Sequence, residues 1–217
     1  MVTILSKENS ILGTFVSQLR DVKIQKDRLR FKRNLERIGE VMAYEISKTF
    51  SYKKIDTETP LGIAECKVPD CKVVLATILR AGLPLHQGML NYFDDAGCAF
   101  ISAHRLHHKD GTFEIKVESI SCPNIDNKIV ILCDPMLATG ASIKVAVEGM
   151  LAFGRPKAIH IAAVIGSAYG LTYLERLLPY AHVWLADLDE ELTAKSYIVP
   201  GLGDAGDLSY GEKVSLE

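Results

Sequence analysis

Residues 27–50 place large apolar side chains three or four positions apart, and this spacing predicts an amphipathic helix. The apolar positions are Phe31, Leu35, Ile38, Met42, Ile46 and Phe50. Charged residues occupy the positions between them, so one face of the helix should pack on a core and the other should meet water. Residues 9–20 predict a shorter helix just before it. The chain therefore begins with a helical segment at about 9–50.

From about residue 72 the pattern changes to short apolar runs that alternate with helix-like segments. The runs predict strands at 73–79, 98–103, 128–133, 158–165 and 182–186, and the segments between them predict helices at 84–91, 141–153 and 169–178. Residues 114–121 alternate loosely and predict half of a β-arm. Strands that alternate with helices predict an α/β fold, a mostly parallel sheet flanked by helices, with its core at about 72–190. No repeat or linker divides the chain, so we expect a single domain over 1–217.

The composition narrows the class of protein. Of the 217 residues, 48% are hydrophobic and 24% are charged, as in ordinary globular domains. The formal net charge of -2 argues against nucleic acid as the main partner. No apolar run is long enough to predict a membrane span, and the first residues lack the pattern of a secretory signal. The five cysteines are scattered and odd in number, which favours free thiols in a reducing cytoplasm.

The segment 130–142 reads Val-Ile-Leu-Cys-Asp-Pro-Met-Leu-Ala-Thr-Gly-Ala-Ser. An apolar strand leads to Asp134, and a turn rich in small and hydroxyl residues then opens a helix. A carboxylate can accept hydrogen bonds from sugar hydroxyls, and the unpaired N–H groups of a helix N-terminus bind phosphate. The pattern is therefore typical of a site for a phosphorylated sugar. The alternative is a buried strand followed by an ordinary helix capped by Thr139 or Ser142.

Two arginines also follow predicted strands. Arg80 stands in Ile-Leu-Arg-Ala-Gly (78–82), where small residues let an anion approach the backbone and the guanidinium offers forked donors. A surface arginine in a turn is the alternative. Ligands of parallel sheets bind at the carboxyl ends of the strands, so we expect Arg80, Arg105 and Asp134 to share one rim.

The C-terminal segment 197–207, Tyr-Ile-Val-Pro-Gly-Leu-Gly-Asp-Ala-Gly-Asp, combines glycines with apolar residues. A flexible tail is the alternative, but a polar tail would not need Ile198, Val199 and Leu202. A kinked backbone could present N–H, C=O and N–H to the acceptor, donor and acceptor on one edge of uracil. Cytosine would set donor against donor at a cost of about 1–3 kcal/mol, which predicts a preference for uracil.

On these motifs the chain resembles the uracil phosphoribosyltransferase family from Ile78 to about Gly211. Residues 134–142 resemble that family's loop for 5-phosphoribosyl 1-pyrophosphate (PRPP), 197–207 its uracil-binding segment, and 78–83 its pyrophosphate-side loop. The resemblance implies the fold of type I phosphoribosyltransferases and the conversion of uracil and PRPP into UMP and pyrophosphate, a step of pyrimidine salvage. It also implies Mg²⁺ bound through the pyrophosphate, with Asp204 as a candidate protein ligand.

Carried over position by position, the resemblance implies three sets of site residues. The catalytic set is Arg80, Asp134 and Asp204. PRPP is expected to contact Arg80, Arg105, Asp134, Pro135, Met136, Leu137, Ala138, Thr139, Gly140, Ala141, Ser142 and Asp204. Uracil is expected to contact Ile198, Gly203, Asp204 and Ala205.

Two expectations concern the backbone of these loops. Gly140-Ala141-Ser142 stands where Gly-Gly-Ser is usual in phosphoribosyltransferases. A positive φ at Ala141 would cost about 1–2 kcal/mol, so we expect Ala141 to be the first helical residue instead. The resemblance further implies a non-proline cis peptide in the pyrophosphate loop, near Arg80.

The surroundings of Arg105 depart from the family pattern. The residue stands in His-Arg-Leu-His-His, where the family more often has an aromatic residue before the arginine and Asn-Glu-Glu after it. This leaves the arm, 106–127, without an assigned role. The histidines at His104, His107 and His108 have no carboxylate or cysteine at ligand spacing, so we do not expect a metal site there.

Three alternatives stay open. Residues 20–37 hold eight basic and three acidic residues, which suits a pyrimidine-operon RNA-binding regulator that kept a PRPP loop. Only Phe31 is interleaved as an aromatic residue, so a solvated helix face or a subunit contact is favoured. The others are a purine or orotate phosphoribosyltransferase and a binding module without activity. The family also implies a homodimer or higher homo-oligomer, with 27–50 as a candidate contact, and GTP as a candidate effector.

Overall fold

The computed structural model describes residues 1–107 and 113–213, with the backbone alone for 104–107, 113 and 114. Its main sheet has the strand order β1-β10-β9-β7-β4-β5-β6, and β8 pairs with β9 beside this path. The strands are β1 (Val2–Ile4), β4 (Val73–Leu79), β5 (Gly97–His107), β6 (Phe113–Ser121), β7 (Ile129–Cys133), β8 (Met136–Leu137), β9 (Ala158–Ser167) and β10 (Ala181–Asp189). All pairs are parallel except β5 with β6, as the sequence predicted for the core and the arm.

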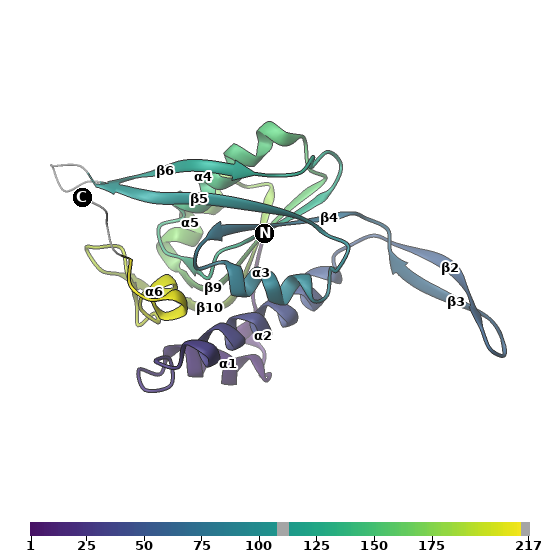
Figure 1. Ribbon diagram of the computed structural model, residues 1–217, viewed down its shortest axis with the longest axis horizontal. Coiled ribbons are helices and arrows are strands. Elements are labelled where there is room, and N and C mark those ends of the chain that lie inside the picture. Colours follow the sequence, from purple (N-terminus) through teal and green to yellow (C-terminus); the bar gives the residue numbers. More distant parts are fainter. Residues whose placement is uncertain (108–112, 214–217) are drawn as a thin grey trace.

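Helices cover both faces of the sheet (Figure 1). One face carries α1 (Leu12–Arg20), α2 (Arg28–Ser47) and α3 (Leu83–Leu90), and the other carries α4 (Ala141–Met150) and α5 (Ala168–Leu177). Short 3-10 turns follow β1 at Leu5–Lys7 and α4 at Leu151–Phe153. The predicted layered α/β fold is therefore confirmed.

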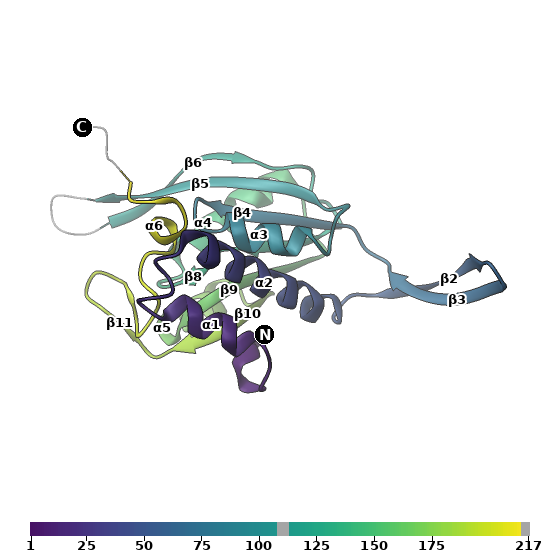
Figure 2. The same cartoon turned by 60° about the horizontal axis from the view of Figure 1, so that its bottom comes forward.

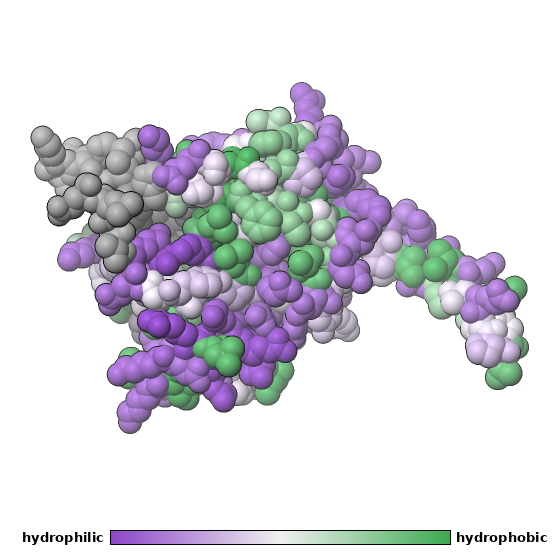
Figure 3. Space-filling view, viewed as in Figure 1, coloured by the Kyte–Doolittle hydropathy of each residue, from purple (hydrophilic) through white to green (hydrophobic). Residues whose placement is uncertain are grey.

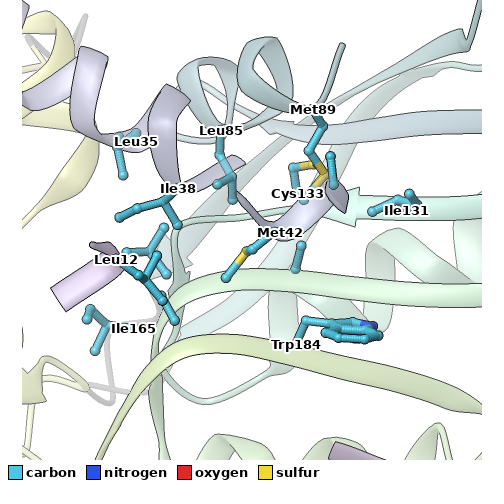
Figure 4. Close-up of a cluster of buried hydrophobic side chains, with 14 of the residues drawn as sticks. Leu12, Leu35, Ile38, Met42, Leu85, Met89, Ile131, Cys133, Ile165 and Trp184 are labelled. Atoms are coloured by element: carbon cyan, nitrogen blue, oxygen red, sulfur yellow. The ribbon is translucent and has the colours of Figure 1, made fainter. Parts of the chain in front are cut away.

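The apolar stripe of α2 lies in the core that it shares with α1, α3 and the sheet. Phe31, Leu35, Ile38, Met42 and Ile46 are all buried, as the spacing predicted. The carboxylate of Asp27 begins the helix by accepting hydrogen bonds from the N–H groups of its first turn. Figure 4 shows Leu35, Ile38 and Met42 among Leu12, Leu85, Met89 and the strand residues Ile131, Cys133 and Trp184.

Several elements lie outside the sequence predictions. An antiparallel hairpin of β2 (Tyr52–Thr59) and β3 (Gly62–Pro69) projects from the body (Figures 1 and 2). The segment after β10 forms a small antiparallel pair, β11 (Glu191–Leu192) with β12 (Ile198–Val199), followed by α6 (Ala205–Tyr210). The short β1 pairs with β10 at the edge of the sheet. Within the described residues, no helix is both long and apolar enough to span a membrane.

The strand order places a topological switch point between β4 and β7. From β4 the chain crosses through α3 on one face to β5, whereas from β7 it crosses through α4 on the other face to β9. Ligands of open α/β sheets bind where such crossovers diverge, outside the carboxyl ends of the strands. Arg80 directly follows β4 and Asp134 directly follows β7, so both stand at this point.

Candidate active site

The turn after β4 packs directly against the end of β7. Thr77 on β4 is in register with Cys133 on β7. A Cβ atom on Gly82 would lie 2.3 Å from the Thr77 Oγ1 and 2.6 Å from the Cys133 carbonyl oxygen, so this contact requires glycine. The peptide between Leu79 and Arg80 is cis, as the resemblance implied. The turn therefore places Arg80 beside the end of the strand that leads to Asp134.

The loop after β7 is held in a fixed shape by hydrogen bonds. The Asp134 N–H donates to the Ala162 carbonyl at 3.1 Å, and the Asp134 Oδ1 accepts from the Met136 N–H at 3.2 Å. Further along, the Ser167 hydroxyl donates to the Ala138 carbonyl at 2.6 Å. The loop thus rests on β9 along its length, with the largely buried carboxylate of Asp134 at its start.

Helix α4 begins as the sequence analysis expected. Gly140 is its N-cap with φ of 79°, and Ala141 is the first helical residue. Neither hydroxyl residue occupies the cap position, although the Thr139 Oγ1 accepts from the Ala141 N–H at 3.4 Å. No acidic side chain stands in the first turn. The N–H groups at this end of α4 therefore suit an anion such as a 5′-phosphate.

The C-terminal segment packs against the body of the protein through part of its residues, so it is not a flexible tail. Ile198 and Leu202 belong to the core on the α1–α3 side of the sheet. The peptide between Val199 and Pro200 is cis, and Gly201 and Gly203 have φ of 59° and 93°. These positive angles produce the kinked backbone that the sequence analysis expected for reading a pyrimidine edge.

Arg80 links this C-terminal segment to the switch point. Its Nη2 donates to the Gly211 carbonyl oxygen at 3.0 Å and lies 3.4 Å from the Asp207 Oδ1. A Cβ atom on Gly206 would lie 3.9 Å from the Ala81 Cβ, so the turn and α6 are in close proximity. The loop 80–82 therefore contacts the end of β7 on one side and α6 on the other. Asp204 caps α6 by accepting from the Asp207 N–H at 3.0 Å.

One donor of Arg80 has no acceptor among the described residues. Its Nε is buried, and within the part of the chain that the structure describes no hydrogen-bond partner reaches it. An unpaired buried donor is costly, and an anionic ligand would satisfy it. This supports the expectation that Arg80 faces pyrophosphate.

The surroundings of Cys133 do not suit a nucleophile. It stands directly before Asp134 but is fully buried, and its sulfur contacts the Met89 sulfur at 3.5 Å. Burial and the neighbouring carboxylate raise the pKa of the Cys133 thiol well above its usual value. The thiol stays protonated at neutral pH, so covalent catalysis through this residue is disfavoured.

Arg105 differs from the prediction. It was expected just past the carboxyl end of a strand, but its backbone lies inside β5, which continues to His107. The strand forms an antiparallel arm with β6 from Phe100 to His107, and the register shifts between Ser102 and Ala103. The sequence pattern ended the strand at the last apolar residue, whereas pairing with β6 extends it. The side chains at 104–107 and all of His108 lie outside the described residues, so the roles of Arg105 and the histidines stay predictions.

The sequence analysis did not identify some polar residues at this end of the molecule. Ser167 anchors the loop after β7, and Asp189, at the end of β10, accepts from the Gly201 N–H at 2.8 Å. Asp189 could have been found, because it lies three residues beyond the predicted apolar strand 182–186. Nothing in the sequence singles out Arg20, whose guanidinium contacts both Asp189 and Gly201.

A carboxylate at the switch point, followed by a helix start that suits phosphate, fits the class that the motifs predicted, the phosphoribosyltransferases. The family model for uracil phosphoribosyltransferase matches residues 6–211. The chain is 54% identical over 211 residues to the uracil phosphoribosyltransferase of Porphyromonas gingivalis strain ATCC 33277, covering 97% of this chain and 98% of the relative. It is 37% identical to that of Pyrococcus furiosus, covering 97% and 90%. The chain belongs to the uracil phosphoribosyltransferase family, as its motifs predicted.

A solved structure agrees with the fold. A protein from Aquifex aeolicus superposes with a TM-score of 0.88 at 27% identity, covering 99% of this chain and 100% of that one. Both relatives from Porphyromonas gingivalis and Pyrococcus furiosus bear the enzyme's name, which favours the enzyme over an RNA-binding regulator.

Proposed function

We propose that this chain, as a single domain over 1–217, transfers the 5-phosphoribosyl group of PRPP to uracil and releases UMP and pyrophosphate. The observation that carries the proposal is the position of the loop 80–82. This loop contacts the end of β7, where the phosphate loop begins, and α6, which closes the C-terminal segment. A sugar phosphate held by one and a base held by the other would then lie close enough to react.

The proposed chemistry is electrostatic rather than covalent. As pyrophosphate departs, the anomeric carbon becomes cation-like and negative charge collects on the leaving group. Arg80 supplies donors to that charge, and the N–H groups at the start of α4 hold the 5′-phosphate. Asp134 accepts hydrogen bonds from the ribose hydroxyls. The protein therefore needs to orient two substrates and offset charge, without a nucleophilic side chain.

The base is read by main-chain atoms in this proposal. Ile198, Gly203 and Ala205 present backbone groups to uracil, and the positive φ of Gly203 turns the chain there. Cytosine would leave a buried donor facing a donor, at about 1–3 kcal/mol, so uracil should be preferred by about tenfold to a hundredfold.

Mg²⁺ fits the available residues only together with the substrate. Within the described residues, no three His, Cys, Asp or Glu side chains form a metal-binding group. Mg²⁺ is commonly held by one or two carboxylates and substrate phosphates. The carboxylate of Asp204 stands exposed at the start of α6 and accepts from the N–H of Asp207, whose own carboxylate lies 3.4 Å from the Arg80 Nη2. When bound, the ion would offset the charge of the departing pyrophosphate.

The cellular setting and the assembly are parts of the same proposal. All five cysteines carry free thiols, which suits a reducing compartment such as the cytoplasm. We infer a homodimer or higher homo-oligomer, but not through the apolar stripe of α2, because that stripe is buried inside the chain. The β2–β3 hairpin is the better contact, since Leu61 and Ile63 are exposed on it. GTP is retained as a candidate effector.

The direct test is an acceptor screen. Purified protein is given PRPP and Mg²⁺ with uracil, cytosine, orotate or hypoxanthine, and pyrophosphate release and nucleotide formation are measured, with and without GTP. UMP formation with uracil alone is expected. Release with orotate or hypoxanthine would indicate a different phosphoribosyltransferase, and RNA binding without UMP formation would indicate the regulator.

A further inference from the structure

A partly buried ion pair holds the middle of the C-terminal segment in place. Arg20 is the last residue of α1, and Asp189 is the last residue of β10, which lies beside α1 in Figure 2. The Arg20 Nη1 donates to the Asp189 Oδ2 at 2.8 Å, and its Nη2 donates to the Asp189 Oδ1 at 2.8 Å. This is a two-pronged pair, the geometry that fixes an arginine most firmly. The Asp189 side chain is only 6% exposed.

Both main-chain polar groups of Gly201 are held by this pair. The Gly201 N–H donates to the Asp189 Oδ2 at 2.8 Å, and the Gly201 carbonyl accepts from the Arg20 Nη1 at 2.9 Å. Gly201 has φ of 59°, and a Cβ atom there would lie 2.2 Å from the Ile198 carbonyl oxygen. The tight turn therefore exists because glycine permits it and because Arg20 and Asp189 satisfy its buried polar groups.

The outer side of Arg20 has different partners. Its Nη2 also donates to the Asp187 Oδ2 at 2.7 Å, and Asp187 lines, with Arg20, an open hollow of about 490 Å³ between α1 and β10. Burial alone would lower the pKa of Arg20, but its hydrogen bonds with Asp189 and Asp187 raise it above the usual value. The guanidinium thus stays charged, with an inner side on Gly201 and an outer side towards solvent.

A neighbouring side chain supports the same loop. The Gln25 Nε2 donates to the carbonyl oxygens of Leu19 and Arg20 at 3.1 Å each, and its Oε1 approaches within 4.0 Å of where a Cβ atom on Gly203 would stand. The end of α1 and the segment after it therefore lie next to the turn at Gly201–Gly203. Ile198 and Gly203, the proposed readers of the base, stand three residues before and two after Gly201.

We propose that Arg20 and Asp189 are positioning residues for base recognition: they set the orientation of the main-chain groups at Ile198 and Gly203 that read the pyrimidine. The inference rests on the proposed function, because it needs the C-terminal segment to bind uracil. An error of about 1 Å in such a contact can reduce activity by about a hundredfold. Loss of the Arg20–Asp189 pair should therefore weaken recognition of the base and leave the phosphate loop after β7 unaffected.

The test compares Arg20→Met, Arg20→Lys and Asp189→Asn with the wild-type enzyme. Arg20→Met should raise the KM for uracil about tenfold or more, with the KM for PRPP changed by less than about twofold. The ratio of kcat/KM for uracil over cytosine should fall in parallel, because misplaced donors and acceptors discriminate less. Arg20→Lys keeps the charge and should recover part of the effect, whereas Asp189→Asn should resemble Arg20→Met.

Two matched controls separate positioning from general stability. Asp187→Asn removes the charge of the outer partner of Arg20 and keeps a side-chain oxygen that can accept from the Ser6 hydroxyl. It should leave the KM for uracil within about twofold. Arg33→Met removes an exposed arginine that pairs with Glu36 on α2 and should do the same. Thermal unfolding of each variant identifies those that fail to fold, and Arg20→Lys serves as the milder variant in that case.

The outcomes distinguish the proposed function from the positioning role of Arg20 and Asp189. If the wild type makes no UMP from uracil, the proposed function fails and this inference fails with it. If the wild type makes UMP but Arg20→Met and Arg20→Lys leave the KM for uracil and the base preference unchanged, this inference alone is overturned. Equal increases in the KM for uracil and for PRPP, or an equal effect of Asp187→Asn, would also overturn it, because they indicate a structural role without selectivity.

Discussion

Arg80 and Gly211 stand 131 positions apart in the sequence, yet the Arg80 Nη2 donates to the Gly211 carbonyl oxygen at 3.0 Å. This hydrogen bond holds the C-terminal segment against the turn after β4. Among the described residues, the buried Nε of Arg80 has no hydrogen-bond partner. The arginine that holds the C-terminal segment therefore also has a donor for a ligand. The pairing brings two motifs that are distant in the sequence together at one end of the sheet.

The first prediction concerns turnover. Arg80→Ala should lower kcat by about a hundredfold to a thousandfold, because loss of one donor to developing negative charge has that effect in other enzymes. The KM for uracil should change much less, since the base is read elsewhere. Steady-state kinetics with each substrate varied in turn measures both quantities. Arg30→Ala, an exposed arginine on α2, is the control, and unchanged turnover in Arg80→Ala would refute the role.

The second prediction concerns the phosphate loop. The Ser167 hydroxyl donates to the Ala138 carbonyl at 2.6 Å and accepts from the Gly170 N–H at 2.9 Å. Ser167→Ala leaves a buried acceptor and a buried donor unpaired, which should lower the free energy of unfolding by about 1–3 kcal/mol and raise the KM for PRPP. Urea unfolding and kinetics provide the measurements.

The matched control for that variant lies on α5, the helix that Ser167 caps. Thr172→Ala removes an exposed hydroxyl that donates to the Ala168 carbonyl, and it should change the unfolding free energy by less than about 0.5 kcal/mol. A KM for PRPP that is the same in Ser167→Ala as in Thr172→Ala would show that the hydroxyl does not support the phosphate site.

Periodicity predicted the core of this molecule well, because buried strands and amphipathic helices impose strong apolar patterns. The strand at 73–79 and the start of α4 at Ala141 agree with the structure. Helix α2 agrees as well, since its apolar stripe packs on the sheet. Where one face of an element meets a core and the other meets water, the pattern is informative.

The missed elements lack that contrast. Every residue of β2 is exposed, so no buried face imposed an apolar alternation on it. The strand β1 spans only Val2–Ile4, too short for a periodic signal. Arg105 was placed beyond its strand because pairing with β6, a tertiary contact, extends β5 into a polar sequence.

The site was predictable where a motif is continuous and not where contacts are distant. Asp134, Gly140 and Ala141 belong to one local segment, so their arrangement followed from the sequence. Arg20 and Asp189 meet across 169 positions, and a hydrogen bond of that kind leaves no mark in the spacing of residues.

The third prediction concerns pH. His160 is buried, and its Nδ1 accepts from the Trp184 indole N–H at 3.0 Å. Burial, with a smaller effect of His182, lowers the pKa of His160 from 6.5 to about 4. The folded state thus disfavours the charged form. Stability from this residue is complete above pH 6.5 and is lost as the pH falls towards 4, with a maximum loss of about 3 kcal/mol.

Urea unfolding between pH 4.5 and 7.5 checks this dependence. The unfolding free energy of the wild type should rise with pH across the lower part of the range. His160→Gln should flatten that slope, whatever its effect on absolute stability. His182→Gln should flatten it less, because His182 is less buried, although its pKa is also lowered by burial and by the N-terminal amine. Equal slopes in the wild type and His160→Gln would contradict the assignment.

The fourth prediction concerns assembly through the β2–β3 hairpin. Figure 3 shows apolar surface on this projection, and Leu61 and Ile63 are 100% and 76% exposed. Exposed apolar side chains on a projecting hairpin are unfavourable in water, and a second copy of the chain would cover them. We expect the wild type to sediment as a dimer or larger at micromolar concentration. Leu61→Asp combined with Ile63→Asp should shift it towards the monomer, because two charges would have to be desolvated in the contact.

Lys54→Ala is the matched control, since it breaks only the exposed pair with Glu65 on the same hairpin and should leave the sedimentation unchanged. A wild type that sediments as a monomer, or a double variant that sediments like the wild type, would exclude the hairpin as the contact.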